Sequence, residues 1–228
     1  MQYIITILSL FAFVGCNHAE STKTKSATKN QITEETKEQQ TENKKTMDTN
    51  KNYEVATLGG GCYWCMEAVF QRLDGVIKVE SGFSGGHVKN PSYHAVCTGT
   101  TGHAEVIQIT YDTTKVQFSE ILKVFFTMHD PTTLNQQGND IGTQYRSAIF
   151  YHSEAQKTEA EKIIADLNEA HAYPSKIVTE VTKFDVFYKA EDYHQNYYND
   201  NKTQGYCQYV IQPKVEKFEK VFKDRLKK

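Results

Sequence analysis

The stretch 53-YEVATLGGGCYWCMEAVFQRL-73 decides the fold, because an apolar strand gives way to a helix within it. Residues 53–58 have the composition of a strand, three glycines follow, and apolar residues then recur at helical spacing: Met66, Val69, Phe70 and Leu73. Cys62 is therefore expected in the first turn of a helix, where free backbone N–H groups and the helix dipole favour a thiolate over a thiol. With two large aromatic residues beside it, Cys62 is predicted to be a nucleophile with its own apolar binding wall.

The Cys62-x-x-Cys65 pair allows other interpretations. Such a pair can be half a zinc site, a structural disulfide or a thioredoxin-type redox pair. Zinc needs further Cys or His ligands, but Cys97 and Cys207 occur singly and no second C-x-x-C is present, so we expect no metal site. The local pattern leaves a redox or nucleophilic role and a structural disulfide equally open.

The N-terminus has the pattern of an export signal. Residues 3–14 form an uncharged apolar run that is too short to span a bilayer comfortably and fits the apolar region of a signal peptide, although no Lys or Arg precedes it. Val14-Gly15-Cys16 then resembles a bacterial lipobox, with Phe13 where leucine is usual. We expect residues 1–16 to be a lipoprotein-type signal peptide and Cys16 to be lipidated, which predicts an exported bacterial lipoprotein held on the membrane by its lipid alone. An ordinary signal peptide or a short anchor helix is the alternative.

Composition separates the rest of the chain into two parts. Residues 17–52 contain no aromatic residue and alternate charges of both signs, so they are predicted to be a disordered tether. Residues 53–228 are about the length of one ordinary domain. The net charge of −2 does not point to nucleic acid as a partner, and four cysteines are too few for a disulfide scaffold.

The domain alternates strands with helices, which indicates a mixed α/β layered fold. Residues 91–102, 132–143 and 193–198 are expected to be loops, and the first of these holds Tyr93 and Cys97. Strands are predicted over 53–58, 76–83, 103–111, 144–151 and 177–181, and helices over 62–73, 118–129, 153–167 and 213–228.

An ordered set of motifs resembles the A-type peptide methionine sulfoxide reductases over roughly residues 55 to 212. Any one motif is weak, but the ordered set is highly specific. The motifs are Gly61–Trp64, Gly82–Gly86, Asn90–Tyr93, Gly102–Val106, His129–Thr132, Gly138–Ser147 and Ala190–Gln195. Tyr63 stands where the family usually has Phe, which keeps the aromatic wall, and Cys65 stands where many members have Gly.

The resemblance implies an α+β fold: a two-layer α/β sandwich with a mixed sheet, a ferredoxin-like core and a long irregular C-terminal segment. Residues 53–228 would be the catalytic domain of a monomeric enzyme that reduces methionine S-sulfoxide, free or in oxidised proteins. No cofactor would be bound, because a thioredoxin-like thiol reductant would supply the electrons.

The resemblance also assigns roles to residues. A bare thiolate reduces a sulfoxide poorly unless the oxygen is protonated as it leaves, so the reaction needs a nucleophile, an acid and a pocket for the methyl group. Cys62 is the nucleophile and Glu105 the acid, with a pKa expected to be raised beside an apolar wall. The resemblance adds Tyr93 and Tyr145, as hydrogen-bond donors to the oxygen, and Asp140 to the catalytic set. It places Tyr63, Trp64, Tyr197 and Tyr206 against the substrate.

The reaction would leave Cys62 as a sulfenic acid, which a second thiol must resolve. Cys65 lies one helical turn away, and Cys207 matches a resolving position of the family on a segment expected to be mobile. Cys97 is expected to be a buried thiol. The main alternative is a thioredoxin-like thiol–disulfide oxidoreductase that uses only Cys62 and Cys65, and a structural or metal-binding surface protein is a third class.

Overall fold

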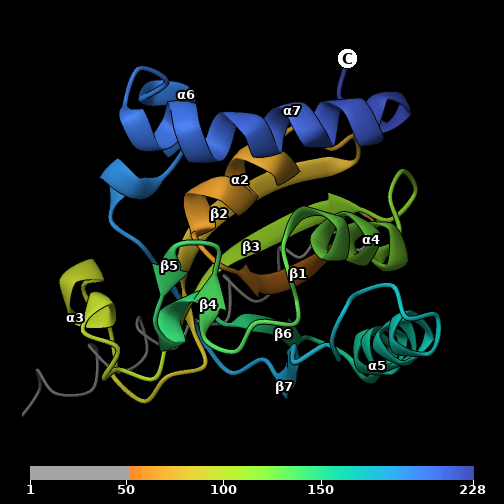
Figure 1. Ribbon diagram of the computed structural model, residues 1–228, viewed down its shortest axis with the longest axis horizontal. Helices are drawn as coiled ribbons and strands as arrows, with labels where there is room; N and C mark the ends of the chain where they lie inside the picture. The colour runs from red at the N-terminus through yellow and green to blue at the C-terminus, as the bar shows by residue number, and fades with distance from the viewer. Residues whose placement is uncertain (1–51) are drawn as a thin grey trace, which may run out of the picture. The chain divides into compact units, whose positions relative to one another are not determined.

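The computed structural model describes residues 52–228. The expectations for the signal peptide, for Cys16 and for nearly all of the tether therefore lie outside the described residues. In the part that is described, the chain begins directly with β1 and forms a six-stranded sheet with helices packed on it (Figure 1).

The sheet has the strand order β7-β6-β1-β3-β2-β8. Its four central strands run β6-β1-β3-β2, all antiparallel, and arise from a β-α-β-β-α-β succession, which is the ferredoxin-like arrangement. The parallel pairing of β6 with β7 makes the sheet mixed, as predicted. The strands are β1 (Tyr53–Gly60), β2 (Val76–Ser84), β3 (Ala104–Asp112), β6 (Ser147–Tyr151), β7 (Glu180–Lys183) and β8 (Phe187–Lys189).

Three helices build the main core with the sheet: α2 (Tyr63–Phe70), α4 (Phe118–Met128) and α7 (Gln212–Val221). In Figure 1, α7 lies alongside α2. A fourth helix, α5 (Glu154–Glu169), packs against α4 and β6. The remaining elements are short: α3 (Tyr93–Cys97), α6 (Tyr197–Asp200), and the hairpin of β4 (Gln136–Gln137) and β5 (Asp140–Ile141).

The alternation of β3 decides where the acid lies. Ile107 and Ile109 point into the helix-covered core, whereas Ala104 and Val106 belong to a smaller cluster that includes Phe150. Because side chains alternate along a strand, Glu105 falls on the face of β3 that α2 covers. The sheet therefore places a carboxyl group beneath the start of α2.

Several predicted boundaries are wrong. The loop over 91–102 contains α3, which Ser92 caps by accepting a hydrogen bond from the N–H of Ala95. Helix α2 ends at Phe70 and not at Leu73, because the chain turns into β2 at Gly75, whose φ is +86°.

Further along the chain, two strands start later than expected. A 3₁₀ turn at Thr143–Tyr145 occupies the start of the predicted 144–151 strand, so β6 begins at Ser147. The strand predicted at 177–181 is β7, at Glu180–Lys183.

The C-terminal segment, residues 190–211, is more ordered than predicted. It contains a 3₁₀ turn at Asp192–His194, then α6, and it ends in a π-helical turn at Cys207–Ile211 that continues directly into α7. No helix within residues 52–228 is long and apolar enough to cross a bilayer.

Candidate active site

The junction of β1 and α2 presents Cys62. Gly61 has a φ of +83°, which L side chains rarely adopt, and a Cβ there would lie 2.5 Å from the Cγ of Gln137. Cys62 is the residue just before α2, and its carbonyl accepts the N–H of Cys65 at 3.1 Å. The predicted position at a helix start is therefore confirmed, and it depends on a glycine.

Burial of Cys62 opposes the thiolate preference expected from its position at a helix start. The side chain is 6% exposed, and desolvation raises the pKa of its thiol well above the ordinary value. A hydrogen bond between the two thiols lowers the pKa of Cys65 to about 7, against the opposing effect of burial. The pair therefore gives up one proton near neutral pH and holds the second strongly, and the hydrogen bond allows the remaining proton to reside on either sulfur.

Glu105 lies beside this pair as an anchored acid. It is 2% exposed, and its Oε2 accepts the backbone N–H of Tyr63, the first residue of α2, at 3.1 Å. Burial raises the pKa of Glu105 to about 8, the Tyr63 N–H opposes that rise, and the nearby Asp140 and Cys65 add to it. The carboxyl group is therefore mostly protonated at neutral pH, in the direction predicted from the sequence.

Two tyrosines and an aspartate lie close to Cys62 and Glu105. The hydroxyl of Tyr206 donates to Oδ2 of Asp140 at 2.8 Å and also hydrogen-bonds the Cys62 thiol. Tyr145, on the 3₁₀ turn, has a pKa raised by burial and by the charges of Glu105 and Cys62. The structure thus brings the predicted Tyr145, Asp140 and Tyr206 to the thiol.

Tyr93 approaches the same centre from α3. Its backbone N–H donates to Oε1 of Glu191 at 3.1 Å, and its ring lies 4.4 Å from the ring of His194. Burial raises the pKa of the Tyr93 phenol, and its hydrogen bond with Cys97 and the charge of Glu105 raise it further.

The aromatic wall consists mainly of Trp64 and Tyr197. Their rings stack in parallel, 3.8 Å apart and at 8°, and the ring of Tyr206 meets Trp64 edge-on at 5.9 Å. Tyr63 lies behind this surface, since it is 1% exposed and packs 5.9 Å from Phe83. The outer wall is therefore Trp64 and Tyr197, with Tyr63 as its support.

The other two cysteines differ from expectation. Cys207 is not on a mobile loop: it is buried in the π-helical turn, and burial together with the charge of Cys65 raises its pKa. Cys97 is not a buried thiol: it is exposed, because it lies at the end of the short surface helix α3.

Comparison with known proteins identifies this arrangement. The family model "Peptide methionine sulfoxide reductase" matches residues 54–226. The chain belongs to the peptide methionine sulfoxide reductase family. It is 58% identical over 174 residues to the "Peptide methionine sulfoxide reductase MsrA" of Saccharolobus solfataricus. The aligned stretch covers 76% of this chain and 97% of the relative.

Solved structures of this family have the same fold. Mxr1 from Saccharomyces cerevisiae in reduced form superposes with a TM-score of 0.63 at 35% identity, over 70% of this chain and 91% of that one. Methionine sulfoxide reductase A of Corynebacterium diphtheriae gives a TM-score of 0.62 at 36% identity, over 72% of this chain and 82% of that one. The chain is thus an enzyme that reduces methionine sulfoxide, and the thioredoxin-like alternative is not favoured. Within residues 52–228, no group of His, Cys, Asp and Glu side chains could hold a metal ion.

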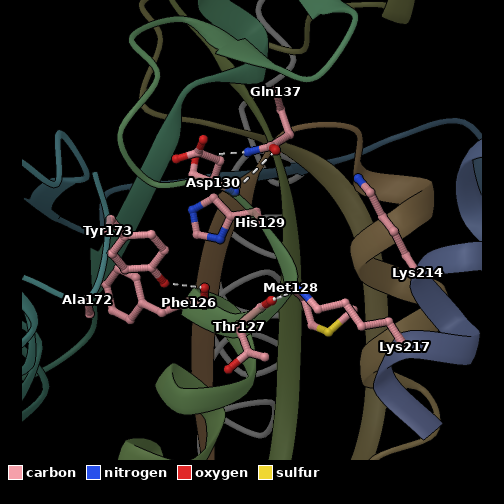
Figure 2. Close-up of a pocket in the computed structure, with 10 residues that line it drawn as sticks. All are labelled: Phe126, Thr127, Met128, His129, Asp130, Gln137, Ala172, Tyr173, Lys214 and Lys217. Carbon is pink, nitrogen blue, oxygen red and sulfur yellow. Dashed lines mark hydrogen bonds between the residues drawn. The ribbon is translucent and has the colours of Figure 1, made fainter. Parts of the chain in front are cut away.

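Two pockets lie near the reductase site. The smaller, about 350 Å³, is lined by Asp140 and Tyr206 and so adjoins the thiols. The larger, about 590 Å³, shares Gln137 and Lys214 with it, and no cysteine lines either pocket. Figure 2 shows the larger pocket, with Lys214 and Lys217 extending from α7 and with Tyr173 and Phe126 on the opposite side. Of the residues assigned to sulfoxide reduction, only Asp140 and Tyr206 line one of these two pockets, and both line the smaller one.

Two residues that hold the site were not assigned a role from the sequence. Gln137 bonds the backbone of Asp130 through both ends of its amide, at 3.0 and 3.1 Å (Figure 2). Its side chain also fills the space that a Cβ at Gly61 would need. The buried Arg146 donates to the carbonyls of Thr143 and Gly102, which fixes the turn that carries Tyr145. Arg146 lies inside a quoted motif, but Gln137 has no sequence signal because its contact exists only in the fold.

His194 was also missed. It is buried, and its ring lies 5.5 Å from those of both Tyr63 and Trp64. The signal was its place in the motif Ala190–Gln195, which names a residue without telling whether it packs or reacts.

Proposed function

We propose that this enzyme reduces the S-epimer of methionine sulfoxide, both free and in oxidised proteins, with Cys62 as the nucleophile and Glu105 as the acid. One observation carries the assignment: a buried carboxyl group with a pKa of about 8 is held by the first N–H of the helix that Cys62 begins. A protonated acid and a sulfur nucleophile at one helix start are what attack on a sulfoxide requires.

In the first step, the Cys62 sulfur attacks the sulfoxide while Glu105 protonates the oxygen. The S–O bond of the substrate breaks and the oxygen ends on Cys62, so methionine leaves reduced by two electrons and Cys62 becomes a sulfenic acid. Tyr93 and Tyr145 donate hydrogen bonds to the oxygen as negative charge develops on it. Phenols are protonated at neutral pH, and burial raises the pKa of both still further, so both can donate.

The substrate packs its methyl group on the aromatic wall. Trp64 and Tyr197 offer the outer surface, and contacts of sulfur with aromatic rings favour such packing. Tyr206 closes the opposite side, where its bond to Asp140 holds its hydroxyl at Cys62.

Resolution passes first through Cys65. Its thiol is hydrogen-bonded to Cys62, so condensation with the sulfenic acid releases water and forms the Cys62–Cys65 disulfide with a small side-chain rotation. Cys207, whose pKa responds to the charge of Cys65, then attacks the Cys65 sulfur and frees Cys62. A dithiol reductant of thioredoxin type reduces the resulting Cys65–Cys207 disulfide.

The enzyme acts as a monomer on the outer side of a bacterial membrane. This part of the proposal rests on the apolar run and lipobox-like Val14-Gly15-Cys16 sequence. Mass spectrometry of protein purified from membranes should find a lipidated Cys16 at the N-terminus, whereas an unprocessed Met1 or a soluble mature chain would refute it. Sedimentation of the same material without its lipid should report one chain per particle.

The direct test of the activity uses both epimers of methionine sulfoxide and a dithiol reductant. Wild type should reduce the S-epimer alone, and Cys62→Ser should form no methionine even in a single turnover. Cys97→Ser is the matched control, because Cys97 is exposed at the end of α3 and serine keeps a hydrogen-bonding group for Tyr93, so its activity should stay close to wild type. Stoichiometric methionine from Cys62→Ser would disprove the assignment.

A further inference from the structure

Helix α2 contains a buried carboxyl group that the proposed reaction does not use. Glu67 is 1% exposed and lies three residues after Trp64, so both side chains project from the same face of the helix. A carboxyl group in such a position is costly to bury unless hydrogen-bond donors surround it.

The donors come from the C-terminal segment. Oε1 of Glu67 accepts the backbone N–H of Asn196 at 2.9 Å, and the N–H of Tyr197 also bonds this carboxyl group. These two N–H groups lie at the start of α6, whose N-cap residue makes no side-chain capping hydrogen bond. Asn196 has a φ of 55°, in the left-handed region, so the chain takes an uncommon backbone conformation at the point that Glu67 holds.

The same turn places the aromatic ring of the wall. The ring of Tyr197 stacks on Trp64 at 3.8 Å while its backbone N–H bonds Glu67. One face of α2 therefore contacts both the ring and the backbone of Tyr197, through Trp64 and Glu67 respectively. Burial raises the pKa of Glu67 to about 7, and the two backbone N–H groups oppose that rise, as expected of groups that stabilise its carboxylate.

We propose that Glu67 is a positioning residue, which fixes the backbone of residues 196–197 so that Tyr197 lies on Trp64 and completes the wall for the methyl group of the substrate. This inference rests on the proposed function, because the wall matters for turnover only if the sulfoxide packs against it. Glu67 acts through Tyr197 and does not touch the reacting atoms.

Trp64 is the sole tryptophan of the chain, so its fluorescence reports this stack directly. In Glu67→Ala the emission of Trp64 should shift to the red, since Tyr197 no longer covers the indole. The KM for methionine sulfoxide should rise by about tenfold, the value of a lost hydrogen bond to a charged group, with a smaller change in kcat. Glu67→Gln keeps an acceptor oxygen and should recover most of both properties.

Gln71→Ala is the matched control. Gln71 also ties α2 to the α6 turn, because its Oε1 accepts a hydrogen bond from the side-chain amide of Asn199 at 3.0 Å, whereas the bond of Glu67 is to the backbone that carries Tyr197. Its emission and KM should match wild type. An equal KM change in Gln71→Ala would show that any loosening of the turn suffices and would overturn the specific role of Glu67.

A double-mutant cycle gives the sharpest result. Tyr197→Ala should reproduce the Trp64 emission shift, and Glu67→Ala should add little to it because both act through one ring. If circular dichroism shows that Glu67→Ala does not fold, Glu67→Met, which fills a similar volume but has no acceptor oxygen, takes its place in the cycle. Additive effects, or unchanged Trp64 emission in the folded variant that lacks the acceptor oxygen, would refute the inference. The emission is measured without substrate, so its outcome is distinct from the loss of sulfoxide reduction in wild type that would refute the proposed function.

Discussion

The two sides of the active site are built differently. Cys62 lies at the start of α2, and Glu105 lies on β3 of the sheet. The hydrogen-bond ladders of β3 with β1 and β2 fix the strand that carries Glu105. Tyr197, Tyr206 and Cys207 stand on the short turns of the C-terminal segment, which is tied to the sheet and α2 mainly by side chains. Glu105, the proposed acid, therefore lies on the side that backbone ladders hold, whereas Cys207, the later partner in the proposed disulfide exchange, lies on the side that is tied mainly by side chains.

Substitution of Glu105, on the sheet side of the site, should cause the largest loss in the rate of the chemical step. Glu105→Gln keeps the shape of the side chain but removes the acidic proton, so the chemical step should slow by roughly 10²–10⁴-fold, the usual contribution of a general acid. Rapid-quench measurement of methionine formation in one turnover tests this. Glu80→Gln on β2, whose carboxylate pairs with Lys78 at 2.8 Å on the surface, is the control and should leave the rate unchanged. A Glu105→Gln rate near wild type would break the comparison.

The pH dependence should separate the acid from the thiols. The pair must lose one proton, and the pKa of Cys65 is about 7, so the rate of the chemical step should rise up to about pH 7. Glu105 must keep its proton, and its pKa is raised from the ordinary 4.5 to about 8, so the rate should fall by about tenfold per pH unit above 8. Glu105→Gln should abolish the alkaline limb alone. An alkaline limb that persists in this variant would assign it to another group.

Cys65, on α2, and Cys207, on the C-terminal segment, should affect different steps of the reaction cycle. Cys65→Ser should prolong the life of the sulfenic acid, whereas Cys207→Ser should leave its decay unchanged and slow steady-state recycling by a thioredoxin. We expect each effect to be on the order of tenfold, because each removes the nearest attacking thiol. Acid quench with peptide mapping identifies the first disulfide. A Cys62–Cys207 bond that precedes any Cys62–Cys65 bond would reverse the order.

Loss of a hydrogen-bonding side chain that holds the C-terminal segment to the sheet should have the smallest effect on the rate of the chemical step. The amide of Gln195 bonds both backbone groups of Ser81, at 2.9 and 3.0 Å. Gln195→Ala should cost about 1–3 kcal/mol of local stability, seen as faster hydrogen exchange in α6, with the chemical step within about threefold of wild type. The exposed Gln208, mutated to Ala, provides the control, and neither quantity should change. A larger loss in the chemical step would mean that the C-terminal side also fixes the acid.

Features of the structure that depend on neighbouring residues in the chain can be predicted from the sequence. The alternation of β3 and the helical spacing after Cys62 are carried by neighbouring residues, so the core strands and the position of the nucleophile are predictable. Motif resemblance names Glu105, Tyr145 and Asp140, and the structure places them together. The raised pKa of Cys62 is not predictable, because it depends on burial by elements distant in the chain and this outweighs the local helix dipole.

Other errors share this cause. The π-helical turn around Cys207 has no periodic signal, and its order comes from continuation into α7. Cys97 looks like an ordinary apolar residue in sequence, but α3 leaves it at the surface. Glu67 sits within an apolar helical pattern as a charged exception, and only the backbone of a distant turn explains it.

Burial of the three thiols determines which oxidants the enzyme tolerates. Cys62, Cys65 and Cys207 are all shielded from solvent, and burial raises the pKa of the Cys62 thiol. Oxidation by dissolved peroxide follows thiolate character and exposure, and burial lowers both at Cys62. The sulfoxide differs from peroxide because it arrives against the wall with Glu105 beside its oxygen. We therefore expect the fold to protect its reactive sulfur from irreversible sulfinic and sulfonic products while the sulfur stays accessible to methionine sulfoxide.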